Sequence, residues 1–402
     1  MSEAAALFDT QWKNNPYPLY AQLREHNPVA RLHDTSYYFV SRYADILAVL
    51  KSPDVFSSRV PGYLRLQSDG AIAFQSSPAA DSEGAILGAE DPPFHTEQRK
   101  ALSAIFNQRV KQLEAQVEHY CVDLVGELPR NESFDFMQLC ARDVPSWAIC
   151  TLLGMPLSMQ EQLGQWAHLL IKRMLGNTSD AGFESSGEAG MALYVYLHEF
   201  LSEAERNPGS NLTGDLVALL KSGTLSRNTV LGMLLQLVVG GADTTASWIG
   251  STLLWMMRNP ELKKAANQAD SLAALLEETL RLETPSQGNY RILKKTAQVG
   301  ETRLPEGSLL VLLWGAANRD EAVYSNPNDV RLERNEPPHL GFGRGIHACL
   351  GARLARLETR AVYAALAPSL QDLHSEMDVT QPAWTESLFS RQLDSLQIRL
   401  DR

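Results

Sequence analysis

The spacing of apolar residues along the chain predicts a mainly α-helical protein. Apolar positions recur at helical spacing in six segments, which predict helices over 97–125, 136–153, 188–205, 229–258, 271–282 and 350–366. Runs typical of strands are short and scattered, at Tyr37–Ser41, Thr302–Leu304, Ser308–Leu313 and Leu396–Leu400. We therefore predict a mainly α fold with small β-sheets.

Nothing in the pattern divides the chain into separate units. No repeat, low-complexity tract or Gly/Ser-rich linker is present, so we expect one domain over residues 1–402. The segment 57–90 is the longest without clear periodicity. Because long loops inside a compact domain are often functional, we expect this segment to cover a site as a lid.

Charge and hydropathy narrow the class of protein. The chain holds 36 Lys and Arg against 47 Asp and Glu, a formal net charge of −11, and no long basic run, which argues against nucleic acid as a partner. No stretch reaches the roughly 18 uninterrupted apolar residues of a membrane span. The first residues show neither the basic start nor the apolar core of a signal peptide. We expect a cytoplasmic protein that does not bind a membrane.

Four cysteines divide into two kinds. Cys121, Cys140 and Cys150 lie in apolar, helix-like surroundings and are expected to be small buried residues. No C-x-x-C spacing occurs, so neither a zinc site nor a redox dithiol is indicated. Cys349 stands instead in a stretch rich in glycine and polar residues.

The surroundings of Cys349 suit a metal-bound thiolate. Glycines precede it at 341, 343 and 345 and follow it at 351, which permits close approach of a flat ligand. Helical periodicity begins after it, so we predict that Cys349 lies at a helix N-terminus, where free amides favour an anion. The spacing F-G-x-G-x-H-x-C-x-G from Phe342 to Gly351 resembles the haem-binding signature of cytochromes P-450. By that resemblance, Cys349 is the proximal ligand of the iron.

The centre of the predicted helix 229–258 is unfavourable for a helix. It holds Gly240 and Gly241, followed by Asp243 and Thr244, and a Thr hydroxyl can bond the carbonyl four residues back and bend the helix. Read alone, this pattern also fits a glycine-mediated helix crossing. G-G-x-D-T-T is similar to the central helix of the same family, which implies that Asp243 and Thr244 deliver protons during the activation of dioxygen.

Glu278 and Arg281 are three residues apart on one predicted helical face. Taken alone, this spacing is common on surface helices. Arg281 precedes Cys349 by 68 residues (349 − 281), and the position resembles a buried structural pair of the family, completed here by Arg334. Such a network would fix the geometry of the cysteine loop.

A haem carries two propionates that need cations. Read singly, His95, Arg99, Arg291 and His347 would be ordinary surface residues. The resemblance implies that these four hold the propionates, with Arg291 placed after a turn at Gly288–Tyr290.

The resemblance therefore implies a haem-thiolate monooxygenase with haem b (iron protoporphyrin IX) between the long central helix and the cysteine-loop helix. It would insert one atom of dioxygen into a lipophilic small molecule, by hydroxylation or epoxidation. Its electrons would come from NAD(P)H through a separate ferredoxin or flavodoxin with its reductase, and we expect a monomer. The alternatives are a haem-binding sensor or electron carrier, a hydrolase using Cys349 and His347, and a helical scaffold.

Two surfaces follow from this interpretation. Pocket walls are expected from 57–90, from Val238 to Ala242, from Gly288–Tyr290 and near Leu388 and Phe389, with Gln75 and Asn289 as polar members. The electron donor is expected to meet a basic face behind the cysteine, made by Lys100, Arg109, Lys111, Arg344, Arg353 and Arg356.

Overall fold

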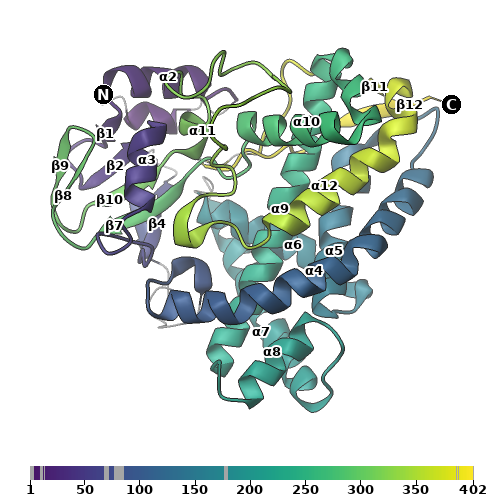
Figure 1. Ribbon diagram of the computed structural model, residues 1–402, viewed down its shortest axis with the longest axis horizontal. Helices are drawn as coiled ribbons and strands as arrows, with labels where there is room; N and C mark the ends of the chain where they lie inside the picture. Colours follow the sequence, from purple (N-terminus) through teal and green to yellow (C-terminus); the bar gives the residue numbers. More distant parts are fainter. Residues whose placement is uncertain are drawn as a thin grey trace.

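The computed structural model describes residues 4–9, 12, 14–67, 72–76, 86–175, 180–385, 387 and 389–401. The main sheet and the hairpins lie on the side of the molecule that holds the N-terminus, the small sheet with β11 (Leu373–Ser375) and β12 (Gln397–Leu400) lies beside the C-terminus, and the long helices fill the space between them (Figure 1). The predicted mainly α fold with small sheets is confirmed.

All six predicted helical segments are helical. The helices are α2 (Tyr17–His26), α3 (Tyr43–Leu50), α4 (Phe94–Gly126), α5 (Asp143–Leu153), α6 (Gln160–Met174), α7 (Asp180–Arg206), α8 (Leu212–Lys221), α9 (Arg227–Arg258), α10 (Ala269–Leu282), α11 (Trp314–Ala317) and α12 (Ala352–Leu366). The predicted segment 136–153 is split, because a π-helical turn at Met137–Ala141 precedes α5. Helices α2, α3, α6, α8 and α11 were not predicted.

The main sheet joins strands that are far apart in the sequence. Its order is β1 (Val29–Arg31), β2 (Tyr37–Val40), β10 (Leu309–Leu312), β7 (Asn289–Leu293) and β3 (Phe56–Ser57). β2 and β10 pair in parallel, and β10 pairs antiparallel with β7. A second sheet has the order β11 (Leu373–Ser375), β12 (Gln397–Leu400) and β6 (Ser133–Asp135), and β8 (Ala297–Val299) pairs with β9 (Thr302–Leu304).

Two predictions of local structure were wrong. The turn expected at Gly288–Tyr290 is instead the start of β7, so Arg291 lies within a strand, opposite Leu310 of β10. The segment 57–90 holds a hairpin of β4 (Gly62–Leu66) and β5 (Ile72–Ser76) and a short turn of helix at Leu87–Ala89. The hairpin is only partly buried on both faces, which explains its weak alternation of apolar and polar residues. Residues 68–71 and 77–85 of this segment lie outside the described part of the chain.

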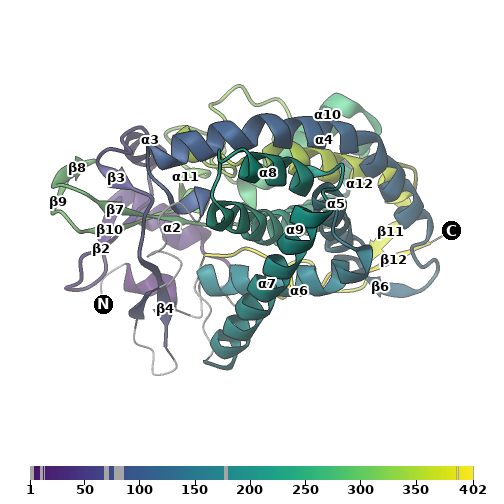
Figure 2. The same ribbon diagram turned by 90° about the horizontal axis from the view of Figure 1, so that it is seen from below.

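Helix α9 forms the centre of the molecule. Ser226 caps its N-terminus by accepting a hydrogen bond from the Thr229 amide, and the helix ends before Pro260. In Figure 2 it lies between α4 and α12 on one side and α6 and α7 on the other. Within the described residues it alone is long and apolar enough to cross a membrane, and 67% of its most apolar window is buried inside the protein. It is therefore a core helix.

Candidate active site

A cavity of about 300 Å³ lies between α9 and the cysteine loop, residues 339–351. One wall comes from the middle of α9, with Gly240, Gly241 and Thr244, and another comes from the loop, with His347 and Cys349. The cavity occupies the position expected for a cofactor between the central helix and the cysteine-loop helix.

The backbone conformation of the cysteine loop requires glycine at two positions. Gly343 and Gly345 have φ of +63° and +73°, and a Cβ at Gly345 would lie 2.9 Å from the Leu50 carbonyl oxygen. The Cys349 amide donates to the Phe342 carbonyl over 2.8 Å, which fixes the cysteine within the loop. Side chains larger than glycine would therefore disturb the loop at these positions.

Cys349 lies just before a helix rather than in its first turn. Helix α12 begins at Ala352, three residues later, so the prediction of a cysteine at the helix N-terminus needs this correction. The amides of Gly351 and Ala352 nevertheless donate hydrogen bonds to its sulfur. Burial raises the pKa of the Cys349 thiol, while these amides and the positive charges of Arg99 and Arg356 oppose that rise. A bound metal ion would deprotonate such a thiol outright.

Four basic side chains converge on the same cavity. His95, Arg99, Arg291 and His347 all line it, and the rings of His95 and His347 lie 4.1 Å apart. Both ring nitrogens of His95 and Nε2 of His347 are buried without a hydrogen-bond partner. Burial, with the charge of Arg291 and the nearby His95, lowers the pKa of His347 to about 3, and burial lowers the pKa of Arg291 to about 10. Among the residues that the structure describes, no carboxylate forms an ion pair with any of these four groups.

The nearby carboxyl groups do not supply an anion for these four residues. Asp91 is engaged elsewhere, because it accepts from Ser57 Oγ over 2.6 Å and pairs with Lys294 Nζ at 3.1 Å. Glu358 lines the cavity, but its burial raises its pKa well above the usual value, which disfavours its ionised form. The four basic residues therefore fit a ligand with two carboxylates, as in the haem propionates.

The two glycines at the centre of α9 have different surroundings. A Cβ at Gly241 would lie 2.4 Å from Ile149 Cδ1 of α5, so this glycine permits a close helix crossing. A Cβ at Gly240 would meet no atom within 4 Å, and the Thr244 hydroxyl donates to the Gly240 carbonyl over 2.9 Å. The predicted hydrogen bond and the helix-crossing alternative thus both describe this helix.

Asp243 does not line the cavity that Thr244 lines. It faces a second cavity, of about 730 Å³, on the side of α6. Its carboxylate is buried and accepts hydrogen bonds from Gln392 Nε2 and, over 2.9 Å, from Nδ1 of His168 on α6. His168 and Gln392 could not be identified from the sequence, because each comes from a distant segment without a recognisable motif.

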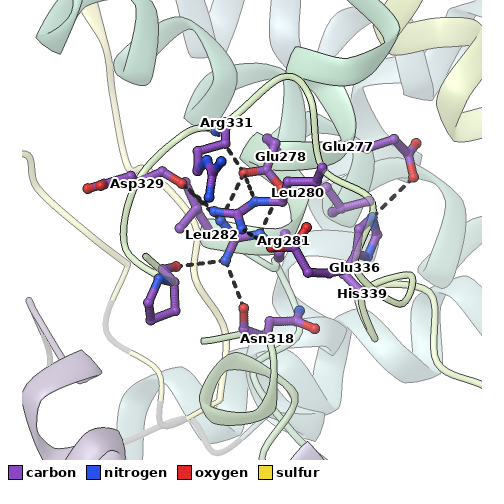
Figure 3. Close-up of polar contacts among 12 residues, drawn as sticks. Glu277, Glu278, Leu280, Arg281, Leu282, Asn318, Asp329, Arg331, Glu336 and His339 are labelled. Carbon is purple, nitrogen blue, oxygen red and sulfur yellow. Dashed lines mark hydrogen bonds and ion pairs between the residues drawn. The ribbon is translucent and has the colours of Figure 1, made fainter. Parts of the chain in front are cut away.

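The pair Glu278–Arg281 is buried, with 7% and 1% of the side chains exposed. Arg281 donates to both carboxylate oxygens, over 2.8 and 2.9 Å. Arg334 Nε donates to Glu278 Oε2 over 2.7 Å, and the Arg331 amide donates to the same oxygen. Figure 3 shows how Arg281 also reaches backbone carbonyls of the strand-free segment before the cysteine loop, including that of Asn318 at 2.9 Å.

The pocket walls agree with the sequence in part. Among the expected positions, Gly240, Gly241 and Asn289 line the cavity, and so do Leu87 and Gly88 from the segment 57–90. Val238, Ala242, Tyr290, Phe389 and Gln75 do not line it, and Leu388 lies outside the described residues. Among the lining residues that were missed are Met233, Gln236 and Leu237. They lie one and two turns before Gly240 on the same face of α9, so helical periodicity could have identified them.

Only part of the expected basic face carries charges that are not paired within the protein. Helices α4 and α12 pack together (Figure 1), and Lys100, Lys111 and Arg353 on them are exposed. Arg109 forms a two-pronged ion pair with Asp215 of α8, over 2.6 and 2.8 Å. Arg356 pairs in the same way with Glu277, over 2.7 and 2.8 Å. These two arginines are therefore neutralised within the protein.

Comparison with known proteins agrees with this geometry. A family model described as cytochrome P450 matches residues 66–385. Cytochrome P450 144 of Mycobacterium tuberculosis is 29% identical over 399 residues, covering 98% of this chain and 91% of the relative. The vitamin D(3) 25-hydroxylase of Pseudonocardia autotrophica is 28% identical over 409 residues, covering 99% and 97%. The crystal structure of ligand-free CYP164A2 from Mycobacterium smegmatis is similar with a TM-score of 0.86 and 28% identity, over 99% of both chains.

The fold and the cysteine-walled cavity define a haem-thiolate protein. With the family model spanning most of its length, the chain belongs to the cytochrome P450 family. It is accordingly an oxidoreductase that binds haem and iron and acts as a monooxygenase. This assignment replaces the hydrolase and scaffold alternatives.

Proposed function

We propose that this cytochrome P450 inserts one atom of dioxygen into a lipophilic small molecule, by hydroxylation or epoxidation, using haem b bound through Cys349. The proposal rests on one observation. The same cavity has Cys349 on one wall and, on another wall, Thr244 with its hydroxyl bound to the Gly240 carbonyl. An electron carrier or gas sensor has no need of a route that delivers protons to bound oxygen.

Five residues would hold the cofactor. Cys349 would bind the iron, and His95, Arg99, Arg291 and His347 would bind the propionates. Bound haem would supply the binding of dioxygen and the transfer of electrons to it, and the thiolate would donate electron density to the iron. Hydrogen bonds from the Gly351 and Ala352 amides would temper that donation.

Thr244 and Asp243 would supply protons. The Thr244 hydroxyl, held by the Gly240 carbonyl, would orient a water molecule in the cavity. Asp243 would take protons from the polar cavity on the side of α6, where His168 contacts both solvent and the carboxylate. A positioned acid of this kind contributes about 10²–10⁴-fold to rate.

The substrate would be lipophilic with a few polar groups. Leu87, Met233 and Leu237 make the cavity largely apolar, while Gln236 and Asn289 offer hydrogen bonds. A relative named vitamin D(3) 25-hydroxylase supports a molecule of this kind. A screen for substrate-induced shifts of the haem spectrum, across terpenoids, steroids, fatty acids, polyketides and peptides, would identify the class.

The electrons would reach the haem from a separate ferredoxin or flavodoxin and its NAD(P)H reductase. Lys100, Lys111 and Arg353 lie exposed on the two helices next to the cysteine loop. On a chain of net charge −11, such a local basic face would attract an acidic partner. We further propose that residues 1–402 act as one domain and as a cytoplasmic monomer.

The thiolate assignment is tested by the spectrum of the reduced carbon monoxide complex. We expect wild-type protein to show the long-wavelength absorption diagnostic of thiolate ligation and Cys349→His to lose it. Cys150→Ala is the control, because Cys150 is buried in α5 and does not line the cavity. An unchanged spectrum in Cys349→His would refute the assignment. Steady NAD(P)H consumption that requires substrate would separate a monooxygenase from a sensor.

A further inference from the structure

A third cavity, of about 460 Å³, shares no lining residue with the haem cavity. It lies between α2 with the residues before it, the C-terminal end of α9 and the segment 380–391. Buried Glu283, Arg319, Trp384 and Arg391 form its floor, and exposed amide side chains such as Gln381 lie at its rim. Neither the haem nor the proposed proton route uses this space.

Positive charge exceeds negative charge in this cavity. Four guanidinium groups line it, those of Arg24, Arg258, Arg319 and Arg391, against one carboxylate among the described residues, that of Glu283. Arg24 is neutralised from outside the cavity, because it pairs with Glu321 over 2.7 and 3.0 Å. The other three arginines therefore surround a single described carboxylate.

Glu283 is fully engaged by its neighbours. Its carboxylate accepts from Arg391 Nε over 2.9 Å and from the Tyr17 hydroxyl over 2.5 Å, and it lies 3.8 Å from Arg319 Nη2. Burial would raise the pKa of Glu283, but the charges of Arg391 and Arg319 lower it overall, so the group is ionised. None of its hydrogen bonds goes to Arg258.

Unused hydrogen-bond donors line the same cavity. Arg319 is 5% exposed, and its Nε is buried without a partner. Nε1 of Trp255 is likewise buried without a partner. Arg258 donates from Nε to the Val379 carbonyl over 2.7 Å, and no described residue accepts from its two Nη groups. Burial is also the main cause that lowers the pKa of both Arg258 and Arg319, which shows that the surroundings disfavour their charge.

Arg258 is half-buried and has no carboxylate partner among the described residues, and Arg319 keeps a buried Nε without a hydrogen-bond partner, so an anion in the cavity would satisfy both groups. Guanidinium groups bind phosphate oxygens in a two-pronged geometry, which suits several arginines around one tetrahedral anion. The volume exceeds that of a phosphate ion, and the amide rim can bind hydroxyl groups. We propose that this cavity is a binding site for a small phosphate monoester, separate from the haem site.

The test measures binding to the haem-loaded protein by calorimetry and by thermal unfolding at constant ionic strength. The probes are inorganic phosphate and glycerol 3-phosphate, with chloride as the control ion. We expect saturable binding of both phosphates. At a hundredfold excess over Kd the melting temperature should rise by about 3 °C for a chain of this length.

Variants connect the binding to this cavity. Arg258→Gln should weaken binding at least tenfold, and Trp255→Phe should weaken it severalfold while keeping the aromatic ring in place. Arg303→Gln, an exposed arginine in β9, is the matched control and should bind like wild type. The Trp255 variant keeps the test valid if the Arg258 variant fails to fold.

Three results would overturn the proposal. The first is a rise in melting temperature that stays linear in phosphate and is equal in all variants, which is the general effect of an excluded salt. The second is unchanged affinity in both Arg258→Gln and Trp255→Phe. The third is binding of inorganic phosphate without binding of glycerol 3-phosphate, which would exclude a monoester as the ligand.

Discussion

Replacement of Glu278 by alanine should destabilise the protein strongly although the residue lies outside the haem cavity. The carboxylate accepts four hydrogen bonds, from Arg281 Nε and Nη2, Arg334 Nε and the Arg331 amide. Its loss would leave Arg281 without a carboxylate partner among the described residues and Arg334 with only Glu336, at 3.3 Å, while the side chains of Arg281 and Arg334 are only 1% and 8% exposed.

The size of the effect follows from burial. Removing one partner of a buried ion pair costs about 3–5 kcal/mol, a large share of the roughly 5–15 kcal/mol that holds a protein folded. At about 2.1 cal/mol/K per residue, a chain of 402 residues unfolds with an entropy of about 0.8 kcal/mol/K. The loss therefore corresponds to a fall in melting temperature of about 4–6 °C.

The assay compares thermal unfolding and haem content per chain in matched variants. Glu203 and Arg206 repeat the same E-x-x-R spacing on the surface of α7, with 57% and 67% of the side chains exposed. Glu203→Ala should leave the melting temperature almost unchanged, because solvent screens an exposed pair and it contributes little to stability. Glu278→Ala should also reduce haem content, since Arg281 and Arg334 anchor the segment that leads into the cysteine loop. Equal effects in the two variants would show that burial of the pair does not matter.

Three further predictions concern catalysis, reduction and acid stability. Thr244→Ala should still consume NAD(P)H with substrate but release much of the oxygen as peroxide. Asp243→Asn should slow turnover by about 10²-fold or more. Fully coupled, wild-type turnover in both variants would contradict the proton relay. Arg353→Glu should slow reduction by a ferredoxin and weaken the salt dependence of the reduction rate, measured by stopped flow, without altering substrate affinity. Arg356→Glu should also destabilise the protein, because the new carboxylate would repel Glu277. Burial would raise the pKa of Glu277, but hydrogen bonds from Arg356 and His339 lower it to about 2. The stability that the Glu277 carboxylate confers is therefore complete above about pH 5 and is lost as pH falls toward 2. Glu277→Gln should reduce this loss of stability, measured as the difference between urea unfolding at pH 5 and at pH 3.

The local sequence was enough to predict the long helices and the cysteine loop. Helices such as α9 and α12 carry strong apolar periodicity because one face packs on the core, and the loop has an unusual spacing of glycines around Cys349. The hairpin β4–β5 escaped prediction because neither of its faces is consistently buried: Tyr63 and Leu64 are buried on opposite faces and most of its other residues are only partly buried. The start of β7 looked like a turn because Gly288 and Asn289 are typical of turns, and pairing with β10 overrides that local preference.

Partners that meet across the fold could not be predicted from spacing. The E-x-x-R pattern occurs at Glu203 and at Glu278, and only tertiary packing makes the second pair buried. His168 and Gln392 reach Asp243 from α6 and from the C-terminal segment, at sequence separations of 75 and 149 residues. No local rule relates residues so far apart.

Asp243 and Thr244 are neighbours in sequence, yet they face different compartments. The polar cavity beside α6 and the largely apolar cavity beside the cysteine loop are divided by the thickness of one helix. Helix α9 therefore acts as a partition between a cavity lined mainly by polar residues and a largely apolar one. In the proposed relay, a proton would pass only from one residue to the next along this partition, whereas bulk water would have to pass through the packed helix. The same wall would thus admit the protons of the proposed reaction and limit the water that would divert reducing equivalents from the substrate.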